Sequence, residues 1–302
     1  MNPKVAIVTL NWNGLEHLKY FLPSAEKQTY DNYSIIVVDN GSDDSSIEFV
    51  KQYHPNVIIK SLKENLGYSK GFNSGINEAI SLESDYILIT SNDVKLDKHI
   101  VEEGIKLFRQ SEKIGYMSGK IFNLGQKNIL QYAGGRDSIS RRVGPNRGQG
   151  EQDEGQYESV EDFEFMDDVC GLVSTQMVRD VGAYDDDFFF DFEETEWNVR
   201  IRNKGYRIVY NPKMVAWHRI HGSTGGNRNS FLPEYYHWRG KLLFNYKTLS
   251  SSDFFIYCLR LSLIYVPTHW IILIKNGNSF LIYPNILGIL SGFKRVIELK
   301  SK

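Results

Sequence analysis

The first third of the chain alternates short apolar segments with longer amphipathic ones, and this alternation limits the possible folds more than any other feature. Strands are expected at Lys4–Leu10, Tyr33–Asp39, Val57–Lys60 and Asp85–Thr90. Helices are expected between them, at about Gly14–Gln28, Asp44–Tyr53 and Gly67–Leu82. This rhythm builds a parallel sheet through right-handed crossovers. We therefore predict an α/β fold.

The segment SDYILITSNDV, residues 84–94, passes abruptly from apolar residues to Ser91, Asn92 and Asp93. Because ligands of open α/β sheets bind beyond the carboxyl ends of the strands, Asp93 stands where a metal would lie. Mg2+ commonly takes one or two carboxylates and completes its shell with water and phosphate oxygens, which suggests a diphosphate-bearing substrate. A turn followed by a helix cap explains Asn92 and Asp93 equally well.

Polar residues also follow the other strands of this part, as Asn11–Gly14, Asp39–Asp43 and Glu64–Gly67. If a nucleotide binds here, Asp39 can accept a hydrogen bond from a base N–H and Trp12 can stack on the base. The glycines let backbone amides approach phosphate. Ordinary strand-to-helix turns explain any one of these, but four at one edge favour a nucleotide. The sequence NWNGLEHL after the first strand lacks the glycine spacing of a dinucleotide turn or a P-loop.

The segments IVTLNWNG, VVDNGSDD and NLGYSKGFNSGINEAI, followed by SND, resemble the nucleotide-binding half of family 2 glycosyltransferases. The resemblance implies a GT-A fold, in which two abutting Rossmann-like halves share a central, mostly parallel sheet. Such a domain binds a nucleoside diphosphate sugar with a divalent metal, Mg2+ or Mn2+. The donor-binding residues implied by matching position are Leu10, Trp12, Asp39, Asn40, Asn65, Gly67, Lys70 and Asn92, with Asp93 on the metal.

The resemblance gives these residues separate roles. Leu10 and Trp12 would lie by the base, and Asp39 with its neighbour Asn40 would hold the base and ribose. Lys70 would face the base or phosphate, and Asn92 would contact the ribose side. Ser91 departs from the family, where many relatives carry Asn or Asp, but Asp93 is retained.

A second dense motif, FFFDFEETEWNVRIRNKGYRIVYNP, contains Glu193, Glu194 and Glu196 at the start of a helix expected to reach about Lys204. Carboxylates suit a helix amino terminus, and the preceding phenylalanines would partly desolvate a neighbouring carboxylate and make it a better base. The motif resembles the family pattern FFxYxEDxDxxxRxxxxGYxxxxxP, whose second acid is the general base of an inverting transfer. That position is Glu194, where the family more often carries Asp. An extra methylene moves the carboxylate by about an ångström, which can cost on the order of 10²-fold in rate.

Two histidines, His218 and His221, follow a strand expected at Arg207–Tyr210. Each could be a metal ligand, although this spacing alone is weak evidence. The resembled family carries a metal-binding histidine after this strand and then a Gly/Ser loop that closes on the diphosphate. We expect His218 to be the ligand, with His221 as the alternative, and Gly222–Asn227 to be a mobile lid.

The middle of the chain contains a helix expected at Asp97–Gln110, a strand near Gly115–Phe122 and an exposed loop at Gly134–Gln156. After the loop, packed structure is expected to resume at Phe163–Val173, and a helix is expected at Thr175–Val181. The arginines of the loop would either meet an anionic acceptor or form solvated surface charge, and we favour the second. They are Arg136, Arg141, Arg142 and Arg147.

The carboxyl-terminal region combines an amphipathic helix at Glu234–Tyr246 with an apolar stretch at Phe254–Ile274. The stretch is long enough to span a bilayer, but Arg260, Pro267 and His269 interrupt it. A hairpin that docks at the membrane interface is favoured, ahead of an oligomer interface and a transmembrane helix.

Composition excludes several classes of protein. A net charge of −2 and the lack of a Lys/Arg block argue against nucleic-acid binding. Cys170 and Cys258 lie far apart and support neither a disulfide framework nor a zinc site. The amino terminus lacks the pattern of an export signal, so we expect the catalytic part in the cytoplasm, at the inner face of the cell membrane if it docks there.

These observations predict a GT-A domain at residues 1–230, with a nucleotide-binding half at about 1–96 and an acceptor half at about 97–230, and a helical extension at 231–302. The expected function is inverting transfer from a UDP- or dTDP-sugar to a glycan or lipid-linked acceptor of a bacterial surface polysaccharide, with rhamnosyl transfer as one candidate. The alternatives are a non-catalytic nucleotide-sugar-binding module and, more weakly, a sugar nucleotidyltransferase. The last would need a Gly-rich triphosphate loop after the first strand, which this chain lacks.

Overall fold

The computed structural model describes residues 2–111, 113–135, 146–219 and 230–301. The strands are β1 (Val5–Asn11), β2 (Tyr33–Asp39), β3 (Ile58–Ser61), β4 (Tyr86–Ser91), β5 (Val94–Leu96), β6 (Ile114–Asn123), β7 (Leu130–Ala133), β8 (Glu161–Asp162), β9 (Cys170–Ser174) and β10 (Arg207–His218). The α-helices are α1 (Leu15–Ala25), α2 (Ser46–Tyr53), α3 (Gly67–Ser81), α4 (Ile100–Gln110), α5 (Thr175–Val181), α6 (Glu193–Asn203), α7 (Phe231–Thr248), α8 (Ser251–Arg260), α9 (Val266–Lys275) and α10 (Ile282–Lys300). The predicted α/β class is confirmed.

Within the described residues the strands form one mixed sheet in the order β3–β2–β1–β4–β9–β6–β10–β5, with β7 beside β6 and β8 beside β10. The first four strands of this order, from β3 to β4, are mutually parallel. They carry the crossover helices expected from the sequence. The antiparallel strand β9 joins them to the parallel pair β6 and β10. The sheet therefore runs unbroken through both halves.

Register brings the ends of separate strands to one edge of the sheet. Asn11 at the end of β1 lies opposite Asp39 of β2, and Leu10 lies opposite Ser91 of β4. At the other side of the sheet, His218 at the end of β10 pairs with Val94 of β5. Asp93, which precedes Val94, therefore comes close to His218.

Strand β10 is longer than expected, and the predicted end at Tyr210 is wrong. The strand passes through Asn211 and Pro212 and continues to His218, with a register shift against β6 between Asn211 and Val215. Proline is tolerated within strands at such irregularities, because a backbone N–H is not required there. This extension carries His218 to the edge that holds Asp93.

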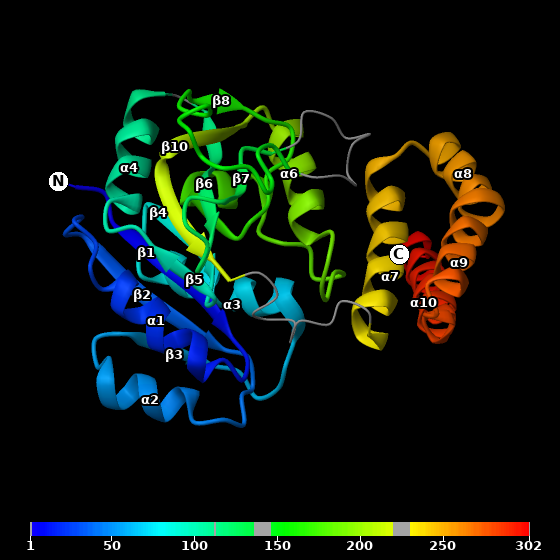
Figure 1. The fold of residues 1–302 in the computed structure, drawn as a ribbon, viewed down its shortest axis with the longest axis horizontal. Coiled ribbons are helices and arrows are strands. Elements are labelled where there is room, and N and C mark those ends of the chain that lie inside the picture. Colours follow the sequence, from blue (N-terminus) through cyan, green and yellow to red (C-terminus); the bar gives the residue numbers. More distant parts are fainter. Residues whose placement is uncertain (1, 112, 136–145, 220–229, 302) are drawn as a thin grey trace.

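Both faces of the central strands are buried. On β1, Val5 and Ile7 belong to one apolar cluster, while Ala6 and Val8 belong to another, because alternate strand residues point to opposite faces. The first cluster includes residues of α1 and α4, and the second includes residues of α3 and α6. Helices therefore cover the sheet on both faces (Figure 1).

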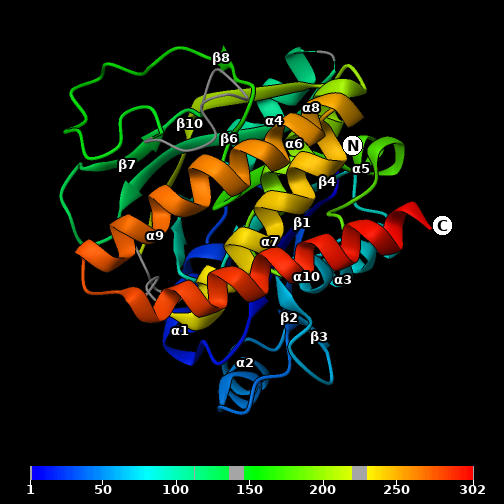
Figure 2. The same cartoon turned by 90° about the vertical axis from the view of Figure 1, so that its right-hand side faces the viewer.

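The carboxyl-terminal helices form a layer beside the sheet (Figure 1), and Figure 2 shows α8–α9 and α10 running on either side of α7. The helical stretch from Ser251 to Lys275 includes a π-helical segment, Leu261–Tyr265, just before Pro267. Helix α10 approaches α7 closely, because Gly288 and Gly292 face the backbone carbonyls of Tyr235 and Arg239. The predicted amphipathic helix at Glu234–Tyr246 lies within α7.

Arg147 shows that the predicted solvated loop is in part packed. Its guanidinium lies 4.7–5.1 Å from the ring centroids of Tyr157, Phe163 and Tyr210, and its Nη1 donates to Glu161 Oε2 at 2.8 Å. The prediction of solvated surface charge is therefore wrong for this residue. Arg136, Arg141 and Arg142 lie outside the described residues.

Candidate active site

Asp93 and His218 lie side by side, as the resemblance implied for a metal site. His218 Nε2 is 3.2 Å from Asp93 Oδ1, and the Asp93 side chain is 1% exposed. Two short segments bring the residues together, since β5 begins directly after Asp93 and pairs with the end of β10. The backbone N–H of Arg219 also donates to the Asp93 carbonyl at 3.0 Å.

A glutamine orients the imidazole of His218. The Nδ1 atom lies 2.7 Å from Gln131 Oε1 of β7, and a carbonyl oxygen can only accept, so Nδ1 carries the proton. In the neutral ring, Nε2 then presents its lone pair to the Asp93 carboxylate. Two acceptors at this distance suit a cation between them, and a hydrogen bond to the far nitrogen is the usual support of a metal-binding histidine. The pair therefore fits a divalent metal.

The metal would need further ligands. No cluster of three or more His, Cys, Asp or Glu residues suited to a metal occurs in the part of the chain that the structure describes. Diphosphate oxygens and water can complete the shell of Mg2+ or Mn2+. His221 and the predicted lid, Gly222–Asn227, lie outside the described residues.

The ends of β1 and β4 are joined by buried amides. Asn92 Nδ2 donates to Asn11 Oδ1 at 2.8 Å, and Asn11 Nδ2 donates to Ser42 Oγ at 3.2 Å. A Cβ atom on Gly14 would overlap the side-chain amides of both Asn11 and Asn92, so a larger residue there would displace this amide pair. Asn92 thus braces the edge at which the donor is expected. The sequence placed its partner Asn11 among the polar residues after the first strand but gave it no separate role.

The predicted nucleotide residues on β2 have different surroundings. Asp39 is buried, and its Oδ1 accepts from the Ser42 N–H at 3.3 Å. The amide of Asn40 is fully engaged: Nδ2 donates to Asn65 Oδ1 at 3.0 Å and to the Gly67 carbonyl, and Oδ1 accepts from the Leu66 N–H. We now expect Asn40 to act on the donor through this loop, and Asp39 to make the direct contact.

The loop before α3 ties the two halves of the domain together. Gly67 has a φ of +83°, and a Cβ atom there would come within 2.6 Å of Phe189, which is closer than non-bonded atoms can approach. The next residue, Tyr68, donates its backbone N–H to the Phe189 carbonyl at 2.7 Å. The predicted residues Asn65 and Gly67 therefore shape the edge of the site.

The remaining predicted donor residues border the same edge. Trp12 is 54% exposed, so its ring is available to stack on a base. Leu10 is half-buried against Gly71 of α3, and Lys70 is exposed in the first turn of that helix. Their contacts with a nucleotide stay predictions.

Glu194 stands in the first turn of α6 and has an unusual pKa. Burial, together with the charges of Asp168, Asp191 and Asp167, raises the pKa of Glu194 to about 8. Its Oε1 accepts from Thr195 Oγ1 at 2.9 Å. A carboxylate with a pKa near neutral is suited to take a proton from a hydroxyl group.

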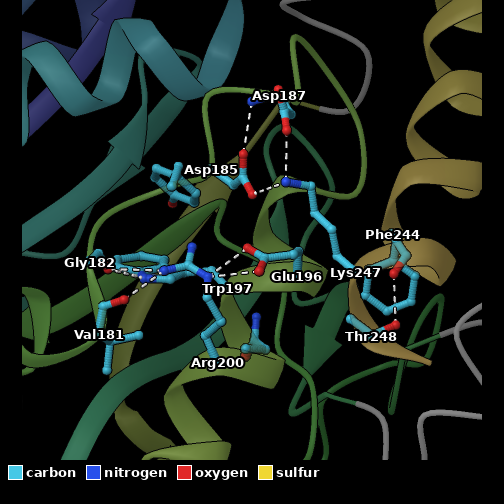
Figure 3. Close-up of polar contacts among 12 residues, drawn as sticks. Val181, Gly182, Asp185, Asp187, Glu196, Trp197, Arg200, Phe244, Lys247 and Thr248 are labelled. Atoms are coloured by element: carbon cyan, nitrogen blue, oxygen red, sulfur yellow. Dashed lines mark hydrogen bonds and ion pairs between the residues drawn. The ribbon is translucent and has the colours of Figure 1, made fainter. Parts of the chain in front are cut away.

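The two neighbouring glutamates, Glu193 and Glu196, have different surroundings. Glu196 forms an ion pair with Arg200, whose Nε donates to both carboxylate oxygens at 2.7 and 2.8 Å (Figure 3). Arg200 also donates to the carbonyl of Val181 at 2.9 Å, so this pair holds α6 to the end of α5. Glu193 is buried, and burial together with the Glu194 charge raises its pKa well above the ordinary value. Glu194 is therefore the base candidate of the three.

Sequence reasoning missed an acidic residue that lies near Glu194. Asp168 is partly buried. Desolvation outweighs the hydrogen bond that Tyr184 donates to Asp168 Oδ2 at 2.7 Å, and it raises the pKa of Asp168 to about 6. The only signal in the sequence was the doublet Asp167–Asp168 in an otherwise apolar segment. Gln131 was also missed, because a single glutamine in a short strand carries no pattern.

Comparison with protein families identifies the first half of the chain. The model described as "Glycosyl transferase family 2" matches residues 5–150. Residues 5–150 are therefore similar to glycosyl transferase family 2. The matched segment covers β1–β7, including Asp39 and Asp93.

Relatives and solved structures extend the similarity beyond that segment. The poly-beta-1,6-N-acetyl-D-glucosamine synthase of Staphylococcus aureus strain COL is 25% identical over 223 residues, which are 71% of this chain and 50% of that protein. The chain thus spans about half the length of the curated relatives it matches. S. aureus TarS in complex with UDP-GlcNAc aligns with a TM-score of 0.56 at 14% identity, over 83% of this chain and 69% of TarS.

A third similarity covers the whole chain. The mannosyltransferase PcManGT from Pyrobaculum calidifontis, solved in complex with GDP-Man and Mn2+, aligns with a TM-score of 0.57 at 13% identity over 100% of this chain and 79% of its own. Identities this low show the fold alone. They confirm the predicted GT-A fold.

Proposed function

We propose that this protein is an inverting, metal-dependent glycosyltransferase. It would transfer a sugar from a UDP- or dTDP-sugar to a glycan or lipid-linked glycan of the bacterial surface, as a hexosyl- or deoxyhexosyltransferase. The observation that carries the proposal is the pair formed by Asp93 Oδ1 and His218 Nε2, 3.2 Å apart, with the imidazole oriented by Gln131. The family match of residues 5–150 supports the reaction class.

Each residue of the proposed site has a separate task. Asp93 and His218 would hold Mg2+ or Mn2+, which neutralises charge on the diphosphate leaving group when it is bound. Asp39 would accept the N3–H of uracil or thymine, and Trp12 would cover the base. Glu194 would take the proton of the acceptor hydroxyl as its oxygen attacks the anomeric carbon from the face opposite the diphosphate. One displacement of this kind inverts the anomer.

The acceptor is proposed from the relatives. The synthase that matches 71% of this chain carries poly-beta-1,6-N-acetyl-D-glucosamine in its name, so a polysaccharide product is the first expectation. We propose that residues 1–230 form the catalytic unit and residues 231–302 a separate helical extension. The catalytic unit would work in the cytoplasm, where nucleotide sugars are made.

The helical extension is proposed to dock on the inner face of the cell membrane. Two of its helical stretches, Ser251–Lys275 and Ser279–Lys300, are long and apolar enough to cross a membrane by length and composition. Large apolar side chains cover their outer faces, including Leu263 at 74% exposed and Ile297 at 67%. Lys275 lies at the turn between the two stretches, where it could meet anionic lipid.

Polar contacts inside the layer favour docking over spanning. Glu234 of α7 accepts from His269 Nε2 at 2.8 Å and from Trp238 Nε1 at 2.7 Å, and Trp270 donates to Asn285 at 3.0 Å. A helix that crossed the bilayer would have to carry these polar groups into hydrocarbon. A surface layer leaves them between the helices and exposes only its apolar outer face.

Transfer can be tested with a panel of nucleoside diphosphate sugars. Donors that raise the melting temperature in the presence of Mn2+ are first selected, and release of nucleoside diphosphate is then measured with glycan acceptors present. Metal-dependent release that is lost in Glu194→Ala is the expected result. Stabilisation by donors without release above the Glu194→Ala control would instead favour a non-catalytic nucleotide-sugar-binding module.

A further inference from the structure

The segment that leads into α6, residues 185–192, is bound by the carboxyl-terminal helices; we call it the base turn, because Glu194 follows it. Lys247 of α7 lies 2.7 Å from carboxylate oxygens of both Asp185 and Asp187 (Figure 3). Arg295 of α10 approaches the other oxygen of Asp187, also at 2.7 Å. Two cations from two helices therefore hold one carboxylate.

These ion pairs are largely shielded from water. The side chains of Asp187 and Lys247 are 12% and 19% exposed. Burial raises the pKa of Asp187, but Lys247 and Arg295 outweigh burial and bring the pKa below its ordinary value. Charge pairs of this kind are screened less than exposed ones and are costly to break from one side.

Helix α7 also holds the last two residues of the base turn. His237 Nδ1 lies 2.7 Å from Asp191 Oδ2, and the ring of Phe192 lies 5.7 Å from that of Phe244. Gly240 faces the same residues, and a Cβ atom there would come within 2.8 Å of the Asp191 carbonyl oxygen. The helix therefore fits closely against the backbone just before α6.

That backbone has an unfavourable conformation. Asp191 and Phe192 have φ angles of 71° and 73°, in the left-handed region that bulky residues rarely adopt. Residues in such conformations persist only where their surroundings fix them, and they are often found at functional sites. Here the surroundings are side chains of α7, and Glu194 lies two residues beyond Phe192.

We propose that the carboxyl-terminal helices position the catalytic base, with Lys247, Arg295 and His237 as positioning residues that fix the base turn and thereby aim Glu194. The inference rests on the proposed function, in which Glu194 is the base. It gives residues 231–302 a second task besides membrane docking. None of the three residues needs to touch donor or acceptor.

The test uses the full chain with Lys247→Met, Arg295→Met and the double variant. Misplacement of a catalytic group by about an ångström can cost on the order of 10²-fold in rate, so kcat of the double variant is expected to fall at least about 10-fold. The Kd for nucleoside diphosphate should change by less than kcat does, because the ion-pair partners of Lys247 and Arg295 are Asp185, Asp187 and Glu298, none of which is a proposed donor residue. Lys247→Arg keeps the charge and should restore most of kcat. Lys294→Met, an exposed lysine beside Arg295, is the matched control.

Amide hydrogen exchange of residues 188–196 gives a readout that does not need activity. Exchange in this segment should become at least about ten-fold faster in the double variant and stay unchanged in Lys294→Met. A double variant with kcat within about two-fold of wild type, or with unchanged exchange, would overturn the inference. If the wild-type protein releases no nucleoside diphosphate from any donor, the proposed function is refuted instead. Amide exchange alone would then decide whether the helices fix the base turn.

Discussion

Replacing Glu194 with glutamine should abolish transfer and, at high pH, make the fold more stable. The folded protein raises the pKa of Glu194 from the ordinary 4.5 to about 8. Between these values the folded state binds more protons at this site than the unfolded chain, so its stability falls as the pH rises through the window. A glutamine has the same shape, carries no charge and does not pay this penalty.

The size of the effect follows from the pKa. Since a tenfold change in proton affinity corresponds to about 1.4 kcal/mol, ionising Glu194 in the folded state destabilises it by at most ~5 kcal/mol above pH 8. We expect roughly half of this, because Glu193 and Asp168 share the local charge and respond to the substitution. The variant should match wild type at about pH 5 and exceed it by about 2–3 kcal/mol at about pH 9.

Urea unfolding of both proteins at the two pH values measures this difference, and release of nucleoside diphosphate measures transfer. Glu196→Gln is the matched control, because it breaks the ion pair with Arg200 and should destabilise the protein by about 1–3 kcal/mol near neutral pH. A Glu194→Gln protein that is less stable than wild type at high pH would refute the reasoning. It would mean that the carboxylate has a favourable partner in the fold.

Three further outcomes are expected. Uridine and thymidine diphosphates should bind more tightly than cytidine diphosphate, since cytosine has no N3–H for Asp39, and equal affinities by calorimetry would remove this role. Gln131→Ala should weaken Mn2+ binding in the presence of UDP by about 10- to 100-fold and His218→Ala by more, while Gln176→Ala, at an exposed position of α5, should leave it unchanged. The full chain should sediment with anionic vesicles at low salt and be released as salt rises, with Leu263→Ser weakening the attachment. Resistance to salt and alkaline carbonate would indicate a spanning helix, and a soluble dimer that ignores vesicles would assign the outer face to oligomerisation.

Features set by short-range pattern could be predicted from the sequence, and two of them matched in both bounds. The strand Tyr33–Asp39 and the helix Thr175–Val181 were predicted with the observed ends, because apolar periodicity and turn residues are local signals. The contact between His218 and Asp93 was predicted only through the family resemblance, because the local sequence around either residue gives no sign that the two are close.

Contacts between distant segments could not be predicted. Gln131 supports His218 only because β7 folds back along β6, and Arg147 is packed only because three aromatic residues from separate segments surround it. The close packing of α7 against the base turn depends on Gly240. In the sequence, a glycine at this position indicates only a residue that lowers helix stability. Such features depend on tertiary packing and leave no periodic trace.

The antiparallel joint between β4 and β9 has a consequence for any attempt to divide the protein. The family match ends at residue 150, yet Tyr86–Thr90 of β4 pairs with Cys170–Ser174 of β9, which lies beyond that limit. A fragment cut at the match boundary would expose the apolar edge of β4, with Ile87, Leu88 and Ile89 ready to pair with another chain. We therefore expect a fragment that ends at residue 150 to aggregate, and a usable fragment to extend at least through β9.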